Sequence, residues 1–529
     1  MWFKHFFTIR VSYPFHLKRL VRFSWSSLVL ISLFTFAFAN DDVQQKFSED
    51  SKQLIKQAEK LVRKGSLLEA EMILRRAIQQ NENDSKAKLT LSHVLLKQRR
   101  FLDSYDISVN IAKNESTNSR AFALVGMALL NLGNFRDAQR ILENSLKLNE
   151  EDALGWYGLG MLDFYENRIQ KSVNKLEGAT YFDTNEPDFI FSLAQVYARA
   201  EKYKEAADSY NKFLQITPQT DKDRRDRIKG LIGFLSYLGN KQQLYTIDGG
   251  NKQTTLPIEL MRDRPIIVVR VNNKDEKLRF VLDTGSGISV ISEETAKKLN
   301  IKAISRGGNA RAVGGDGKFE IVYGFLKSVN FDDVKIKNVP VYIRKFHDSG
   351  EKVDGYIGLS LISKFLTTVD YGNATFTLTK KDQLSNDGFE KDEIALPLRL
   401  TSSGFLSGEV NLPGIEAPLN FIVDTGASIS VISNELANTE EMSRFSIEEK
   451  MRVVGAAGIT ENVASFMLPK VSFGKHTRES IKAISLNLGI INEASGFQQA
   501  GILGGNFLKN YSLTFDFQKS KVIFVPINK

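Results

Sequence analysis

Residues 280–292 read FVLDTGSGISVIS, and residues 421–433 read FIVDTGASISVIS. Nine of these 13 positions are identical. Each stretch opens with an apolar run typical of a buried strand and then reaches Asp-Thr-Gly, a combination that favours a turn. Two copies of so specific a pattern predict one β-rich unit that occurs twice in the chain.

The duplication extends beyond this motif. Gly-Tyr-Ile-Gly at 355–358 matches Gly-Ile-Leu-Gly at 501–504. The surrounding sequence consists of short apolar runs broken by Gly pairs, which is typical of an all-β domain. We therefore expect one lobe over 255–382 and a second over 391–529, joined by a polar segment.

These motifs together resemble the aspartic proteases, in particular their retropepsin-like branch, with two lobes in one chain as in pepsin-like enzymes. The resemblance covers roughly residues 255–529. It implies an all-β bilobal acid-protease fold, aspartic endopeptidase activity and a catalytic pair formed by Asp283 and Asp424. It also implies that the hydroxyls of Thr284 and Thr425 tie each catalytic loop to the other lobe. The remaining residues expected to support the catalytic loops are Gly285, Ser286, Gly426 and Ala427.

The residue types suit this chemistry without a cofactor or metal. The chain has no Cys, which excludes thiol catalysis and thiolate metal sites, and its five scattered His do not suggest a metal site. Two carboxylates placed together can supply a base and an acid to a water that attacks a peptide carbonyl. Like charges a few ångströms apart cannot both ionise, and the aspartic-protease dyad is an established case of two carboxyls that share one proton.

A Gly-rich turn lies between the two motifs in each lobe: ARAVGGDGKFEIVYG at 310–324 and MRVVGAAGITENVAS at 451–465. An ordinary hairpin tip would explain either one alone. Their matched placement resembles the flaps that close over substrate in retropepsins. The candidate flap residues are Gly314, Gly315, Asp316, Gly317, Gly455, Ala456, Ala457 and Gly458.

The duplicated motif has one chemical asymmetry, Ser286 against Ala427. By resemblance, the side chain after Asp-Thr-Gly points back toward its own aspartate. A hydroxyl there would donate to the carboxylate and favour its charged form. We therefore expect Asp283 to ionise more readily and Asp424 to carry the proton.

The N-terminal half shows a 34-residue period. The segments GSLLEA, RRFLDS, GNFRDA, NRIQKS and EKYKEA begin at residues 65, 99, 133, 167 and 201. Their third positions are all large and apolar: Leu67, Phe101, Phe135, Ile169 and Tyr203. Their sixth positions are all small: Ala70, Ser104, Ala138, Ser172 and Ala206. Such a pairing lets the two helices of a hairpin approach closely, so the period predicts stacked helical hairpins.

These units resemble tetratricopeptide repeats, because Trp156, Leu159 and Gly160 lie in the first helix of the fourth unit and Pro218 follows the fifth. We expect five repeats and a capping helix over 51–240, with the cap at 228–238. The resemblance implies a groove that binds an unknown protein or peptide, while a spacer or docking arm is the plainer alternative. The polar segment 245–255 is expected to separate this arm from the lobes.

The first 39 residues resemble an export leader. They contain five basic residues and no acid, followed by an apolar run at 23–39 that ends in Ala-Phe-Ala. This is the layout of a signal peptide with its cleavage site. An uncleaved membrane anchor is the alternative, because the 17-residue run reaches the lower limit for a spanning helix. Either interpretation places the body of the protein outside the cytoplasm.

The net charge of +9 does not indicate nucleic-acid binding. Five of the 71 basic residues lie in the leader, so the remaining chain carries only +4. We find no run of Lys and Arg with interleaved aromatics. His347 and His476 lie in polar stretches and are expected at the surface.

The sequence thus favours an exported aspartic endopeptidase with a helical-repeat interaction arm. The alternative is a peptide-binding adaptor in which a protease-like scaffold holds extended chains without cleaving them. The intact Asp-Thr-Gly in both lobes favours the enzyme.

Overall fold

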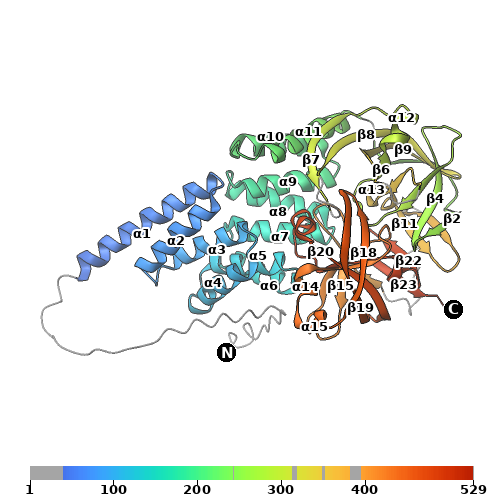
Figure 1. The fold of residues 1–529 in the computed structure, drawn as a ribbon. Helices are drawn as coiled ribbons and strands as arrows, with labels where there is room; N and C mark the ends of the chain where they lie inside the picture. The colour runs from blue at the N-terminus through green and yellow to red at the C-terminus, as the bar shows by residue number, and fades with distance from the viewer. Residues whose placement is uncertain (1–39, 242, 313–317, 348–351, 382–394, 528–529) are drawn as a thin grey trace. The chain divides into compact units, whose positions relative to one another are not determined.

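The computed structural model describes residues 40–527 apart from 242, 313–317, 348–351 and 382–394 (Figure 1). The described chain divides into two compact units. The first contains the described residues up to Leu129 together with Arg136–Gly155, and the second contains Leu130–Phe135 and Trp156–Lys529. The leader and the first candidate flap tip lie outside the described residues.

Helices occupy the described chain as far as Gly239. They are α1 Asn40–Arg63, α2 Leu67–Gln80, α3 Ser85–Lys97, α4 Phe101–Asn114, α5 Ser119–Asn131, α6 Phe135–Leu148, α7 Ala153–Tyr165, α8 Ile169–Phe182, α9 Pro187–Arg199, α10 Tyr203–Ile216 and α11 Lys222–Gly239 (Figure 1). Within the described residues, none of the helices is long and apolar enough to cross a bilayer.

The 34-residue period sets where these helices begin. The second helix of each hairpin starts at the large apolar third position, and the small sixth position lies one turn later. All five small side chains, Ala70, Ser104, Ala138, Ser172 and Ala206, are fully buried. The expected capping helix is α11, whose apolar residues Ile228 and Leu235 join the core of α9 and α10. The helical-hairpin fold predicted for this region is confirmed.

A nine-stranded sheet forms the first lobe. Its main path runs β1-β9-β6-β10-β5-β4-β8-β7, and β3 pairs with β4. The bounds are β1 Thr246–Gly249, β3 Glu259–Met261, β4 Arg264–Val271, β5 Leu278–Leu282, β6 Val290–Ser292, β7 Ser305–Arg311, β8 Lys318–Phe331, β9 Val334–Arg344 and β10 Gly355–Ile357.

An eight-stranded sheet forms the second lobe in the order β14-β15-β16-β21-β17-β20-β19-β18. The bounds are β14 Arg399–Leu400, β15 Leu406–Asn411, β16 Leu419–Val423, β17 Ser430–Ser433, β18 Ser446–Gly455, β19 Gly458–Phe473, β20 His476–Leu486 and β21 Gly501–Leu503. Short helices accompany the lobes: α12 Glu293–Lys298, α13 Leu359–Ile362, α14 Asn434–Ala437, α15 Glu440–Ser443, α16 Gly489–Ser495 and α17 Gly505–Leu508. The predicted bilobal all-β fold is confirmed.

A third sheet, of six strands, is shared by the two lobes. Its order is β13 (Ala395–Pro397), β23 (Lys521–Pro526), β22 (Tyr511–Asp516), β11 (Phe365–Asp370), β12 (Thr375–Lys380) and β2 (Gln253–Pro257). The lobes meet where β11 pairs antiparallel with β22. There the hydroxyl oxygens of Thr368 and Thr514 lie 2.8 Å apart.

The segment expected as a linker is part of the folded second unit. β1 pairs with β9 from Thr246↔Lys337 to Gly249↔Val334, so the first lobe begins before residue 255. The nearby helices also pack on the lobes: Phe234 of α11 stacks on Tyr323 at a ring-centroid distance of 4.5 Å. The polar segment 245–255 therefore does not separate this part of the helical region from the first lobe, because backbone pairing and aromatic packing join them.

His476 is buried rather than exposed. Only 6% of its surface is accessible, and its ring meets Tyr511 edge-on. Lys475 lies in the turn between β19 and β20, which the register pair Phe473↔His476 closes, whereas the polar residues Thr477, Arg478 and Glu479 belong to β20 itself. Burial lowers the pKa of His476 below its usual value.

Candidate active site

Two matched strand pairs position the aspartates. β5 ends at Leu282 directly before Asp283, and β16 ends at Val423 directly before Asp424. Each strand lies parallel to the short strand of the Gly-x-x-Gly motif, β10 or β21. The amide of Asp283 donates to the carbonyl of Ile357, and the amide of Asp424 donates to that of Leu503, both at 3.0 Å. The two apolar-apolar-Gly motifs therefore hold the turns that carry the aspartates.

Thr284 and Thr425 join the turns across the lobe boundary. The hydroxyl of Thr284 donates to the carbonyl of Val423 at 2.7 Å, and that of Thr425 donates to the carbonyl of Leu282 at 2.7 Å. Each hydroxyl also accepts the backbone N–H of the opposite threonine, at 3.2 and 3.0 Å. At most 1% of either threonine is exposed, so these four bonds are shielded from water.

Gly285 and Gly426 allow the two aspartates to meet. A Cβ on Gly285 would lie 2.4 Å from the carboxyl carbon of Asp424, and one on Gly426 would lie 2.6 Å from a carboxyl oxygen of Asp283. Any side chain at either position would displace the opposite aspartate. The amide of each glycine donates instead to the aspartate of its own turn, at 2.9 and 2.8 Å.

The aspartates share one electrostatic environment. Their carboxyl groups meet between the two turns: a Cβ on Gly285 would touch the carboxyl of Asp424, and one on Gly426 would touch that of Asp283. Burial raises the pKa of Asp283 well above its usual range, and repulsion from Asp424 adds to the effect. Burial also raises the pKa of Asp424. The pair therefore keeps one proton at a pH where isolated carboxyls are ionised.

Ser286 does not contact the carboxylate of Asp283 as we expected. Its hydroxyl donates to the carbonyl of Ile288 at 2.8 Å. A carbonyl two residues ahead is a local acceptor that closes the turn, and it satisfies the hydroxyl without the aspartate. Ser286 supports the loop through its own carbonyl, which accepts the amide of Leu359, and Ala427 does the same for Gly505. The hydrogen bond that was expected to make Asp283 ionise more readily than Asp424 is therefore not formed.

The strands that flank each candidate flap pair with each other. In the second lobe β18 and β19 pair up to Gly455↔Gly458, so Ala456 and Ala457 form the turn. In the first lobe β7 and β8 pair up to Arg311↔Lys318, and the candidate residues Gly314, Gly315, Asp316 and Gly317 lie outside the described residues.

Three residues near Asp283 escaped the sequence reasoning: Arg264, Arg344 and Tyr356. Arg264 begins β4, which pairs with β5; Tyr356 pairs with Val281 on β5, and Arg344 pairs with Ser292 at the end of β6. Tyr356 lies in the Gly-Tyr-Ile-Gly motif, whereas no motif marks Arg264 or Arg344. Aligning the lobes strand by strand would have shown that the second lobe has apolar residues at all three positions.

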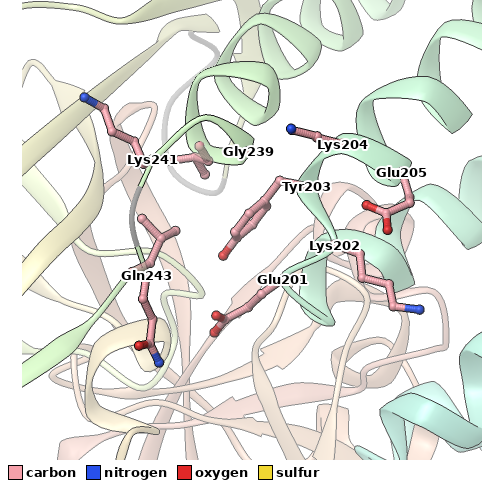
Figure 2. Close-up of a pocket in the computed structure, with 10 residues that line it drawn as sticks. Glu201, Lys202, Tyr203, Lys204, Glu205, Gly239, Lys241 and Gln243 are labelled. Carbon is pink, nitrogen blue, oxygen red and sulfur yellow. The ribbon is translucent and has the colours of Figure 1, made fainter.

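A separate pocket lies in the second unit, between the start of α10 and the chain after α11 (Figure 2). Its volume is about 340 Å³, and charged or polar side chains such as Glu201, Lys204, Lys241 and Gln243 surround Tyr203. None of the catalytic-loop residues lines it. Within the described residues we find no cluster of His, Asp and Glu suited to a metal ion.

Models of known protein families match both the two lobes and the helical repeats of this chain. A family model described as aspartyl protease matches residues 267–361 and 407–507, which include both Asp-Thr-Gly turns. Two models described as tetratricopeptide repeat match residues 126–173 and 187–220. A search of curated proteins finds no match.

Solved structures with similarity include an aspartic proteinase from Irpex lacteus, at 13% identity and a TM-score of 0.37, over 52% of this chain and 98% of that one. A tetratricopeptide-repeat protein from Thermus thermophilus is similar at 18% identity and a TM-score of 0.30, over 34% of this chain and 98% of that one. The family models thus identify an aspartyl-protease domain in the two lobes of the chain and tetratricopeptide repeats in the helical region before them.

Proposed function

We propose that the protein is an exported aspartic endopeptidase whose single active site uses Asp283 and Asp424. The observation that carries this proposal is the close approach of the two Asp-Thr-Gly turns: each glycine lies against the carboxyl of the opposite aspartate, and the reciprocal Thr284 and Thr425 bonds hold the turns together. The ionised member takes a proton from a water as the water attacks the peptide carbonyl. The protonated member stabilises the developing oxyanion and helps to protonate the leaving amine.

The raised pKa values of the pair predict the pH range of activity. Catalysis needs one proton on the dyad, and activity falls when the second carboxyl ionises. Because burial and mutual repulsion oppose that second ionisation, we expect activity to extend from acid toward neutral pH.

Hydrolysis of an unfolded protein, followed from pH 3 to pH 8 with and without pepstatin, tests the proposal. We expect pepstatin-sensitive cleavage by the wild-type chain and none by Asp283→Asn or Asp424→Asn. Cleavage that persists in either variant would place the site elsewhere. An absence of cleavage by the folded wild-type chain at every pH would favour the non-catalytic adaptor.

Export through the first 39 residues is part of the same proposal. Sequencing the N-terminus of the protein recovered from a secreting host tests it. A mature chain that starts at Asn40 supports cleavage of a signal peptide, whereas an intact leader in the membrane fraction supports an anchor. Recovery in the cytoplasm would contradict export.

We further propose that the repeats bind a protein substrate or partner. On α2 the side chains of Leu68 and Met72 lie one turn apart and are 73% and 64% exposed. Exposed large apolar side chains of this kind mark candidate contact surfaces. Replacing both with Ser should weaken cleavage of a folded protein that uses the repeats and leave cleavage of a short peptide unchanged. Equal effects on both substrates would contradict a docking role.

A further inference from the structure

The two lobes place chemically different residues at equivalent positions around the dyad. Tyr356 pairs with Val281, as Ile502 pairs with Ile422 in the second lobe. Arg344 pairs with Ser292, as Leu486 pairs with Ser433. Ile266 pairs with Val281, as Ser407 pairs with Ile422, so Arg264 corresponds to Phe405. The first lobe therefore has polar or charged residues at three positions where the second lobe has apolar ones.

The second-lobe residues form an apolar group beside Asp424. Leu486 and Ile502 belong to one buried cluster, against which Phe405, Ala427 and Ile429 pack. Ala427 and Ile429 belong to the segment that directly follows Asp424-Thr-Gly. A substrate side chain on this side of the dyad would therefore meet an apolar surface.

The first-lobe residues form a cationic group beside Asp283. The Arg344 guanidinium lies over the rings of Phe319 and Phe346, at 5.7 and 5.6 Å from their centroids. Its Nε is buried and has no hydrogen-bond partner, and no ion pair is found for Arg344 among the residues that the structure describes. Burial lowers the pKa of this guanidinium, whereas attraction to Tyr356 and Asp283 acts in the opposite direction.

A partly buried guanidinium without an ion pair is poorly solvated, and a carboxylate is the group that pairs with it best. The dyad with one proton keeps a single negative charge, which is spread over two carboxyls, and no ion pair joins either aspartate to Arg344 among the described residues. A carboxylate carried by the substrate would supply the missing partner.

We propose that Arg344, with Arg264 and Tyr356 beside it, binds an acidic side chain of the polypeptide substrate, while Phe405, Leu486 and Ile502 bind an apolar side chain on the other side of the scissile bond. This inference rests on the proposed function, since it names the substrate class of that site. The preferred substrate is a chain with Asp or Glu on one side of the cleaved bond and a large apolar residue on the other.

The test compares matched peptides with Glu, Gln or Leu at the position on either side of the cleaved bond. At pH 6 a glutamate with its ordinary pKa of about 4.3 is ionised. We expect the wild-type chain to cleave the Glu peptide at least about 10-fold faster than the Gln peptide, in kcat/KM, for one of the two positions. Glu and Gln have nearly the same shape, so the ratio isolates the charge.

The chain offers its own control substitutions. Arg344→Leu copies the second lobe and should reduce the Glu:Gln ratio to about 1 while increasing cleavage of the Leu peptide. Leu486→Arg should create a preference for Glu on the opposite side. A role of Arg344 confined to holding Phe319 or tuning Asp283 would change the rates for all peptides equally and leave the ratio intact. Arg344→Met keeps an apolar stem over both rings and provides a second variant if Arg344→Leu does not fold.

Binding of the same peptides with a reduced, uncleavable bond separates this inference from catalysis. Calorimetry should show tighter binding of the Glu analogue than of the Gln analogue to the wild-type chain. If the wild-type chain binds the Glu analogue more tightly but cleaves no peptide, the proposed protease activity fails and the acidic site stands. A Glu:Gln ratio near 1 in the wild-type chain, or one that Arg344→Leu and Arg344→Met leave unchanged, would overturn the inference.

Discussion

The hydroxyl of Thr284 donates to the backbone of the second lobe, and that of Thr425 donates to the backbone of the first. Each hydroxyl also accepts the other threonine's N–H. Removing one hydroxyl therefore leaves two backbone groups unpaired in a region from which water is excluded. The position of the dyad depends on this small network.

We expect Thr284→Val and Thr425→Val each to lower the free energy of unfolding by about 2 kcal/mol or more, because buried polar groups lose their partners. Thr→Ser at the same positions keeps the hydroxyl and should cost roughly 1 kcal/mol through the lost methyl. Denaturant unfolding of the four variants measures the difference. A Val variant as stable as its Ser counterpart would contradict a bonding role for the hydroxyl.

The aspartates should make the protein less stable as pH rises. Their folded-state pKa values are raised, so between pH 4 and the raised values the folded chain holds a proton that the unfolded chain has lost. Folding thus takes up a proton in this pH interval, so the free energy of unfolding falls as pH increases through it. Asp283→Asn removes the penalty and should unfold at a higher temperature than wild type at pH 7, by about 2–4 °C for each kcal/mol gained.

The stabilisation by Asp283→Asn should shrink as pH falls and vanish below about pH 3, where the carboxyl is protonated in both states. Thermal unfolding at a series of pH values checks this trend. Asp333→Asn is a matched control, because hydrogen bonding from Thr254 lowers the pKa of Asp333 and its carboxylate stabilises the folded chain. A constant difference between wild type and Asp283→Asn at all pH values would show that the carboxyl does not titrate as described.

Ser286→Ala should leave the pH dependence of kcat/KM where it is in the wild type. The hydroxyl donates to Ile288, so its loss changes the stability of the turn by about 1 kcal/mol and not the charge on Asp283. Rates measured across the acidic limb test this. A limb displaced by about one pH unit would mean that the hydroxyl turns to the carboxylate during catalysis.

Arg199 is expected to stabilise the contact between α9 and the second lobe. Its guanidinium lies 3.8 Å from the centroid of the Phe164 ring and donates to the carbonyls of Thr401 and Ser402, at 2.6 and 3.1 Å. Arg199→Met should cost about 2–3 kcal/mol and increase proteolytic cleavage around these two residues.

Arg225→Met provides the control for Arg199, because Arg225 donates only to carbonyls and a hydroxyl of its own helical region, at Leu214, Thr217 and Pro218. It should lower stability without exposing the segment near Thr401. Equal protease sensitivity in both variants would contradict the role assigned to Arg199.

The features predictable from sequence are those that repeat. The 34-residue period fixed the start of each second helix, because a large residue and a small one must recur where the hairpins pack. The paired Asp-Thr-Gly motifs located both turns, because the same close approach is needed in each lobe. Repetition made these positions recognisable with no knowledge of the fold.

The features that sequence reasoning missed depend on contacts between distant segments. Arg199 and Thr401 lie 202 residues apart, and no motif in the sequence around either residue indicates that they form a hydrogen bond. The local acceptor of Ser286 and the burial of His476 were hidden for a different reason: their neighbours in the sequence are turn residues, whose polarity is typical of exposed positions. The cationic group at Arg344 becomes visible only once register pairs align the two lobes.

The shared sheet has a consequence for biosynthesis. Thr514 of β22 follows Thr368 of β11 by 146 residues, which at typical elongation rates corresponds to a delay of roughly 7 to 30 s. During this interval the nascent first lobe presents the edge of β11, without its partner strand, to other chains. Asp424 is translated within this interval, but the sheet that joins the two lobes cannot form until β22 follows, so the open strand edge stays available for pairing with other chains. A chaperone that holds nascent chains would therefore matter most between translation of β11 and translation of β22.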